Sequence, residues 1–350
     1  CMKHYISIII LAIFLFSCNG HSKHWETLSQ VESYIEEKPD SALVTLEQID
    51  LSELSGKEEK AKYALLYSMA LDKNFIDKTD FELLQPAIDY YEDNGSATDK
   101  LRTCYYQGRI YQNLGNDALA MESFVKAISE GDASDDVLTK ARIYFAQSNI
   151  YYSLYEWDNF IETNKRAASY FQQEEKYNSY ANCLIRIING YTLKDNPEDA
   201  LPYIDECKRM LEELSTNRLS DFYSAYLVFV TKYGTDQEIS NLIDEYINII
   251  PDTHKDYLTL SKAYFQIQKY EYALRATNQY KDKRNAPEEI KYKALISMIY
   301  EKLGNYEESL RAYKEYMIVS DSTNYAIMRQ DTKFVEERHN LELQTLKEKE

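Results

Sequence analysis

The fold of this chain is decided by the stretch Cys104-Tyr105-Tyr106-Gln107-Gly108-Arg109-Ile110-Tyr111, which continues through Leu114-Gly115-Asn116 to Ala120, Phe124 and Ala127. Small residues at Gly108 and Ala120 would let two antiparallel helices approach closely. The larger Tyr111 and Phe124 would fill the space beside them, as close packing requires. The stretch therefore predicts a helical hairpin.

The same unit recurs along the chain. Tyr151 follows Tyr111 by 40 residues, and Tyr191 follows Tyr151 by another 40. Later first helices are marked by Val230, Tyr264 and Tyr300, and the residues equivalent to Ala120 are Phe160, Ala200, Ile239, Ala273 and Ser309. Residues 25–49 and 61–91 predict two further pairs upstream. Repeat periods of about 34 to 47 residues are typical of stacked helical hairpins, so we expect about eight of them over residues 24–320.

Proline marks the starts of several of these helices. Pro39, Pro86, Pro197 and Pro287 each stand where a helix is expected to begin. Proline suits the first turn, because the backbone N–H groups there have no partner within the helix. Asn196 precedes one of these prolines and is expected to be an N-cap residue.

The composition supports an all-helical protein. Only 9 Gly and 6 Pro occur in 350 residues, too few for the many turns of a β-sandwich or barrel. The 40 basic residues stand against 58 acidic ones, which gives a net charge of −18. A field of that sign repels phosphate backbones, so no nucleic-acid partner is expected.

The hairpin resembles the tetratricopeptide-repeat (TPR) family, whose small and large positions are matched by Gly108, Tyr111, Ala120, Phe124 and Ala127. The resemblance extends over residues 24–320. It implies an all-α fold, a right-handed α-solenoid of about eight hairpins. It also implies that the protein binds a protein or peptide partner, although the motif is specific for fold and not for function.

The N-terminus resembles an export address. Lys3 and His4 precede an apolar run over residues 6–16, which is too short to span a membrane and typical of a secretion signal. Residues 15–18 (Leu-Phe-Ser-Cys) resemble the lipobox of bacterial lipoproteins, with Phe16 where a small residue is common. The resemblance implies a signal peptide at 1–17, lipidation of Cys18 and a tether at 18–23. The alternative is an ordinary cleaved signal with a chance cysteine.

Two further stretches, Trp-Glu-Thr-Leu at 25–28 and Lys-Pro-Asp-Ser-Ala-Leu at 38–43, resemble TPR lipoproteins of Gram-negative gut bacteria. The resemblance implies a cell-envelope protein, anchored by lipid. The tether contains no acidic cluster, which favours an orientation toward the periplasm over exposure at the surface.

The last segment, 321–350, differs in character. Charged residues crowd it, while Ile327, Phe334 and Leu341 recur seven apart. This pattern predicts a charged C-terminal helix, either a solvated cap of the array or a weak coiled-coil seam. Some relatives of the lipoproteins continue into a transmembrane helix and an output region, and the segment would then be a linker beyond Glu350.

No motif for catalysis or cofactor binding was found. The phosphate-binding, zinc-protease and serine-hydrolase patterns are all missing, so we expect no enzyme and no cofactor. His21 and His24 lie three apart, but nothing completes a metal site. Cys183 and Cys207 would lie near the same end of one hairpin, either as buried free thiols or as a disulfide. Cys104 is expected to be a buried free thiol.

The TPR resemblance places a ligand groove along one face of each first helix. The corresponding residues are Arg102, Tyr105, Arg109 and Gln112, then Arg142, Phe145, Asn149 and Tyr152, and then Asn182, Ile185, Asn189 and Thr192. Guanidinium groups match carboxylates, and Asn side chains can hold a peptide backbone through both amide groups. The alternative is that the arginines pair with acidic neighbours on a solvated face.

These observations predict a lipid-anchored scaffold that binds a protein or peptide through its concave surface. Two alternatives remain open at this point. The chain would be the sensory half of a longer membrane signalling regulator, or a glycan-binding surface lipoprotein whose tyrosines stack on sugars. The 33 tyrosines fall mostly at packing positions of the repeat, which favours the scaffold.

Overall fold

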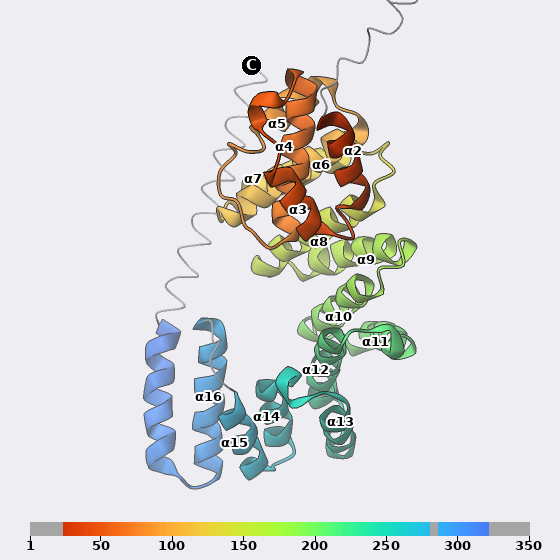
Figure 1. The fold of residues 1–350 in the computed structure, drawn as a ribbon. Coiled ribbons are helices and arrows are strands. Elements are labelled where there is room, and N and C mark those ends of the chain that lie inside the picture. The colour runs from red at the N-terminus through yellow and green to blue at the C-terminus, as the bar shows by residue number, and fades with distance from the viewer. Residues whose placement is uncertain (1–23, 281–285, 322–350) are drawn as a thin grey trace, which may run out of the picture. The chain divides into compact units, whose positions relative to one another are not determined.

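The computed structural model describes residues 24–280 and 286–321, and within those ranges the chain contains helices and no strand (Figure 1). The chain divides into two compact units, residues 1–139 and 140–350. The predicted signal peptide, Cys18, the tether and the C-terminal segment from 322 onward lie outside the described residues. No helix of the described part is both long and apolar enough to cross a membrane.

The first unit contains three helical hairpins. They are α2 (His24–Tyr34) with α3 (Pro39–Glu47), α4 (Gly56–Lys73) with α5 (Gln85–Asn94), and α6 (Ala97–Asn113) with α7 (Asp117–Glu130). A short 3₁₀ turn, η1 (Leu51–Glu53), joins the first two. The first helices also pack on one another, α2 on α4 and α4 on α6, so they form one layer.

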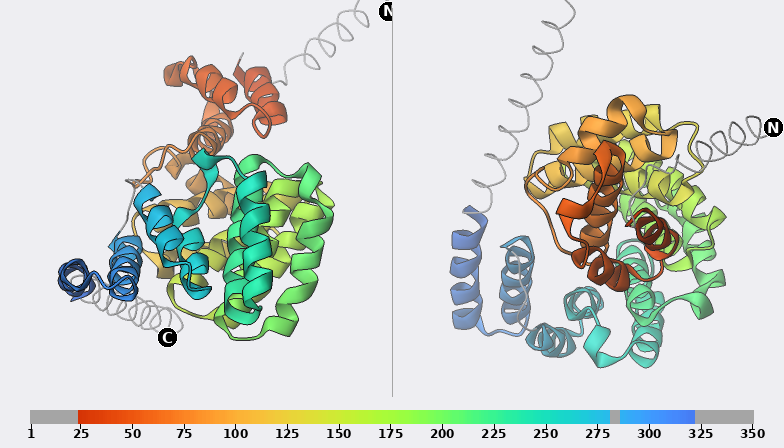
Figure 2. Two further views of the ribbon diagram at one scale, coloured as in Figure 1. Left: turned by 90° about the horizontal axis from the view of Figure 1, so that it is seen from below. Right: turned by 45° about the horizontal axis from the view of Figure 1, so that its top comes forward.

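The second unit contains the rest, and its first helix begins just before the unit boundary. The hairpins are α8 (Val137–Ser153) with α9 (Trp157–Gln173), α10 (Tyr177–Leu193) with α11 (Pro197–Arg209), α12 (Thr216–Tyr233) with α13 (Asp236–Ile249), α14 (Tyr257–Gln266) with α15 (Tyr270–Gln279), and α16 (Ala286–Lys302) with helical residues 306–321. Two 3₁₀ turns, η2 (Leu211–Glu213) and η3 (Asp252–His254), lie between hairpins. Here α10 packs on α12, α12 on α14 and α14 on α16 (Figure 2). The eight predicted hairpins are confirmed.

The helix boundaries follow from local sequence. Pro39 and Pro197 are the first residues of α3 and α11, and Pro86 and Pro287 are the second residues of α5 and α16, as predicted. Asn196 is the N-cap position of α11, although its side chain donates to Asp199 and caps no backbone group. Elsewhere Ser96 and Asp99 form a complete capping box at the start of α6.

Close approach within a hairpin depends on glycine. A Cβ atom on Gly108 would lie 2.4 Å from Cε1 of Phe124, which is closer than atoms can pack. Phe124 and Ala120 are both completely buried. The small residue on α6 therefore faces the aromatic ring on α7, which is the physical reason for the pattern that predicted the hairpin.

The three cysteines of the described residues are free and buried. Burial raises the pKa of Cys104 to about 11 and the pKa values of Cys183 and Cys207 to about 12. Of the two alternatives for Cys183 and Cys207, the structure shows free thiols. These thiols remain protonated at neutral pH, so they are poor nucleophiles.

Candidate functional site

A polar cavity lies in the second unit, on the layer of first helices. It has a volume of about 600 Å³ and lies between α10, α12 and the chain after η3. We call it the α10–α12 hollow, and its lining residues are Asn182, Ile185, Arg186 and Asn189 from α10, Ser220, Asp221, Ser224, Ala225 and Val228 from α12, and His254, Lys255 and Asp256.

The predicted groove positions of α10 meet in this hollow. Asn182, Ile185 and Asn189 were assigned to the groove from sequence, and all three line the cavity. Their equivalents one repeat later, 39 residues on, are Asp221, Ser224 and Val228, and these line the opposite wall. The side-chain amides of Asn182 and Asn189 make no hydrogen bond to other described residues. Both amides are therefore available to a ligand backbone.

Arg186 lines the hollow from α10, and it lies between two aromatic rings. The other cation of the lining, Lys255, pairs with Asp252 at 2.6 Å. The guanidinium carbon of Arg186 is 4.7 Å from the ring centre of Phe145 and 4.9 Å from that of Phe160. Its Nε donates to Oδ1 of Asn164 at 3.0 Å, and its Nη2 donates to Oγ of Ser148 at 3.0 Å. The rings and the two neutral acceptors hold the guanidinium in one orientation.

No carboxylate of the described residues forms an ion pair with Arg186. The two acids of the hollow have other partners: Asp221 pairs with Arg218 at 2.8 Å, and Asp256 accepts from the backbone of Leu258 and Thr259 at the start of α14. Burial lowers the pKa of Arg186 to about 10, so the group is still charged at neutral pH. A partly buried charge without a counter-ion is costly, which is typical of a group retained for a ligand.

Two of the predicted groove arginines have their charge compensated within the first unit. Arg102 pairs with Asp136 at 2.5 Å and with Glu32 at 2.9 Å, and Arg109 pairs with Asp72 at 3.0 Å. Gln112 accepts a hydrogen bond from Arg109. For these residues the structure shows the alternative interpretation, in which the arginines pair with acidic neighbours.

Tyr105 requires a similar correction. Only 5% of its surface is exposed, and its ring packs against Tyr106 and Phe124. The residue belongs to the core of its hairpin, because the α6 helix turns this position toward α7. It cannot line an open groove.

The remaining predicted residues lie on α8, in the second unit. Phe145 contacts Arg186, whereas Tyr152 is half exposed and packs against Trp157 and Phe160. Asn149 is exposed, and Arg142 is partly buried and has interactions of its own. Phe145 thus supports the hollow from behind, through the guanidinium that it contacts.

Sequence reasoning missed Arg186 and the α12 wall. The α12 residues follow from extending the same repeat positions by one more unit. Arg186 falls between Ile185 and Ile187 at a position not assigned to the groove, and its only signal was a basic residue within a strongly apolar segment.

No group of three or more His, Cys, Asp or Glu side chains in the described part of the chain could hold a metal ion. His24, one of the two histidines considered in the sequence, lies 2.8 Å from Glu53. His24 and Glu53 are only two side chains, fewer than the three that a metal site would need.

Comparison with protein-family models gives no match, and comparison with curated proteins gives none either. Solved structures do match. The apo form of RapI superposes with a TM-score of 0.62 at 14% identity, over 92% of this chain and 98% of that one. A tetratricopeptide repeat protein from Parabacteroides merdae ATCC 43184 gives 0.55 at 12% identity, over 78% and 98%. NprR in complex with its cognate peptide NprX gives 0.53 at 17% identity, over 86% and 98%.

At these identities the matches establish the fold. The chain has a tetratricopeptide-repeat fold, built from helical hairpins in the order that the sequence predicted.

Proposed function

We propose that this protein is a peptide-binding or protein-binding scaffold and that the α10–α12 hollow is its ligand site. The observation that carries the proposal is the convergence of three groups in one hollow: the Arg186 guanidinium, which forms no ion pair with a described carboxylate, and the side-chain amides of Asn182 and Asn189, which make no hydrogen bond to other described residues. A carboxylate of the ligand, at its C-terminus or on a side chain, would pair with Arg186. The asparagines would hold the adjacent peptide backbone through both amide groups.

The similarity to NprR, which was solved with its cognate peptide, supports this proposal. The proposal assigns no catalytic residue.

The proposal can be tested with a peptide library. The library is displayed with free C-termini, and enriched peptides are made again with a free or an amidated C-terminus and with acidic side chains replaced by amides. Removal of the recognised carboxylate should weaken binding roughly 10- to 100-fold, the usual contribution of hydrogen bonds to a charged group. Affinity should also fall as salt is raised.

Arg186→Gln should remove the preference for the carboxylate. Arg166→Gln is the matched control, because Arg166 lies on the adjacent α9 helix, is exposed, and pairs with Glu162 outside the hollow. If Arg186→Gln left the carboxylate preference intact, the hollow would not be the site.

We also propose that Cys18 carries a lipid and holds the scaffold in the cell envelope, facing the periplasm. The basic residues, apolar run and lipobox-like residues 15–18 support this. Cys18→Ala should move the protein from the membrane fraction to the soluble fraction or leave it unprocessed. Wild-type protein found free in periplasmic extract would contradict the anchor.

A further inference from the structure

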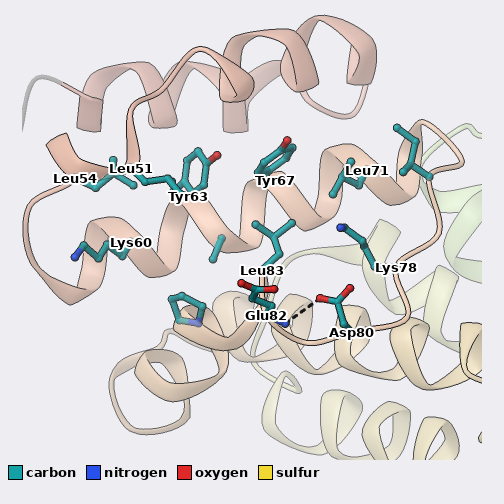
Figure 3. A pocket seen from close by; sticks show the side chains of 13 residues that line it. Leu51, Leu54, Lys60, Tyr63, Tyr67, Leu71, Lys78, Asp80, Glu82 and Leu83 are labelled. Carbon is teal, nitrogen blue, oxygen red and sulfur yellow. Dashed lines mark hydrogen bonds between the residues drawn. The ribbon is translucent and has the colours of Figure 1, made fainter.

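A second cavity, wholly within the first unit, has different chemistry. It has a volume of about 550 Å³ (Figure 3). One wall is a single face of α4, with Lys60, Tyr63, Ala64, Tyr67 and Leu71. The other walls are Leu51 and Leu54 beside η1, and Ile76, Lys78, Asp80, Glu82, Leu83 and Pro86 from the segment that leads into α5. We call it the α4 pocket.

The segment that closes the α4 pocket is held in place from its far side. Asn113 on α6 donates Nδ2 to the carbonyl oxygen of Lys78 at 3.0 Å. The ring of Phe81 packs on the ring of Tyr111, with centroids 4.9 Å apart. The segment from 76 to 83 is therefore anchored to α6 while its other side lines the cavity. The pocket is formed before any ligand arrives, which lowers the cost of binding.

The lining is mainly apolar and partly open to water. Leu51 is 57% exposed and Ile76 is 44% exposed, although both are large apolar side chains of the kind that usually lie in a core. Tyr63 and Tyr67 of α4 both line the cavity, with ring centroids 5.5 Å apart. A volume of this size with a mostly apolar lining and a few polar groups is typical of small-molecule sites.

The charged groups of the α4 pocket are two lysines, Lys60 and Lys78, and two carboxylates, Asp80 and Glu82. Figure 3 shows Lys78 extending over the cavity from one end, with Lys60 at the opposite end. Neither lysine forms an ion pair with a described residue. By contrast, Asp80 already accepts a hydrogen bond from the backbone N–H of Glu82 at 3.1 Å. Lys78 extends over the cavity and has no ion pair with a described residue, so its ammonium group is available to an acidic ligand.

We propose that the α4 pocket binds an amphiphilic carboxylate, an elongated apolar molecule with one acidic head group. The apolar body would lie along Tyr63, Tyr67 and Leu83, and the carboxylate would pair with Lys78. This site is independent of the α10–α12 hollow, because the two share no residue and lie in different units. Either assignment can fail without the other.

The test measures binding of dodecanoate to the full chain by isothermal titration calorimetry. The dodecanoate concentration is kept below that at which it forms micelles. We expect saturable binding of one molecule. Dodecanol and dodecyltrimethylammonium have the same chain with a neutral or a cationic head, and both should bind at least about 10-fold more weakly. Equal binding of the three, tighter binding of the cation through Asp80 and Glu82, or no saturable binding of dodecanoate would overturn the proposal.

Variants locate the site. Lys78→Glu should weaken dodecanoate binding about 10-fold or more. Lys57→Glu should change it less than about twofold, since Lys57 is an exposed lysine of α4 that does not line the cavity. Ala64→Phe should fill the pocket and abolish binding. Because that variant could unfold α4, methyl NMR of the wild type provides a second measurement. The Ile76 δ-methyl resonance, assigned through Ile76→Val, should shift with dodecanoate, and an unchanged resonance at saturation would overturn the proposed location.

Discussion

Nε of Arg186 donates a hydrogen bond to Oδ1 of Asn164 at 3.0 Å, and Asn164 is completely buried. The Asn164 amide nitrogen donates to the carbonyl oxygen of Phe160 at 2.7 Å, which turns the amide oxygen toward the guanidinium. A neutral side chain of α9 thus positions the charge of α10 that faces the α10–α12 hollow.

This contact predicts a coupling between the two residues. Asn164→Leu should lower the free energy of unfolding by roughly 1–3 kcal/mol, because it leaves a charged donor without its acceptor. Arg186→Met in the same chain should recover at least half of that loss, since the charge is then gone. Urea unfolding of both single variants and the double variant gives the coupling energy. If the losses simply add, the two side chains do not depend on each other.

Asp136 predicts an acid-sensitive step in the first unit. Burial alone would raise the pKa of its carboxyl group, but the charge of Arg102 and hydrogen bonds from Thr139 outweigh burial and hold the pKa below its ordinary value. A depressed folded-state pKa stabilises the protein above the unfolded-state value of about 4, and this contribution is lost as the pH falls below it.

Asp136→Asn should therefore be less stable than the wild type at pH 7, by roughly 1–3 kcal/mol. The difference should shrink progressively below about pH 4. Urea unfolding at pH 7, 5 and 3 measures it. A difference that stays constant across this range would show that the carboxylate charge contributes nothing.

Several turns of the array use a left-handed backbone without glycine. Glu175, between α9 and α10, has φ of 53°, whereas Gly115, in a turn of the same hydrogen-bond pattern after α6, has φ of 72°. Glu175 is exposed, and its side chain makes no hydrogen bond to other described residues. Glu175→Gly should therefore raise the free energy of unfolding by up to about 1 kcal/mol, because glycine adopts this conformation without strain. Glu174→Gly, at a negative φ of −95°, should give no such gain and serves as the control.

Close packing between α6 and α7 predicts a specific failure at Gly108. Gly108→Ala should cost roughly 1–3 kcal/mol, because its Cβ would overlap the Phe124 ring. The double variant with Phe124→Leu should lose less free energy of unfolding than the sum of the two single variants, since the smaller leucine makes room for the Cβ atom. Thermal unfolding followed by circular dichroism measures both. Additive losses would mean that the helices separate instead of clashing.

The local part of this fold was open to prediction from sequence alone. The spacing from Gly108 to Phe124, and the prolines at 39, 86, 197 and 287, act through the nearest helical turn or the adjacent helix of one hairpin. Such short-range constraints leave the same mark in every repeat. The eight hairpins and their starts therefore follow from residue type and period.

The repeat positions alone predicted which α10 residues line the hollow. They did not predict the ion pairs of the equivalent residues on α6. Asn182, Ile185 and Asn189 line the hollow, and the two asparagine side chains make no hydrogen bond to other described residues. Arg102 and Arg109 fall on equivalent positions, yet they are paired with Glu32, Asp136 and Asp72, which lie 34 to 70 residues away in the chain. A sequence pattern of period about 40 does not specify which carboxylate a long side chain will reach.

The sequence by itself determined the class of fold, the number of hairpins and the helix faces that meet, because hydrophobic periodicity and backbone sterics act locally. Only the tertiary structure decided which charges remain without partners. It compensates the charges of Arg102 and Arg109, and it leaves Arg186 and Lys78 without an ion pair to any residue that the structure describes. The net interaction of a charge depends on every group within a few ångströms in space, and folding brings those groups from distant parts of the chain.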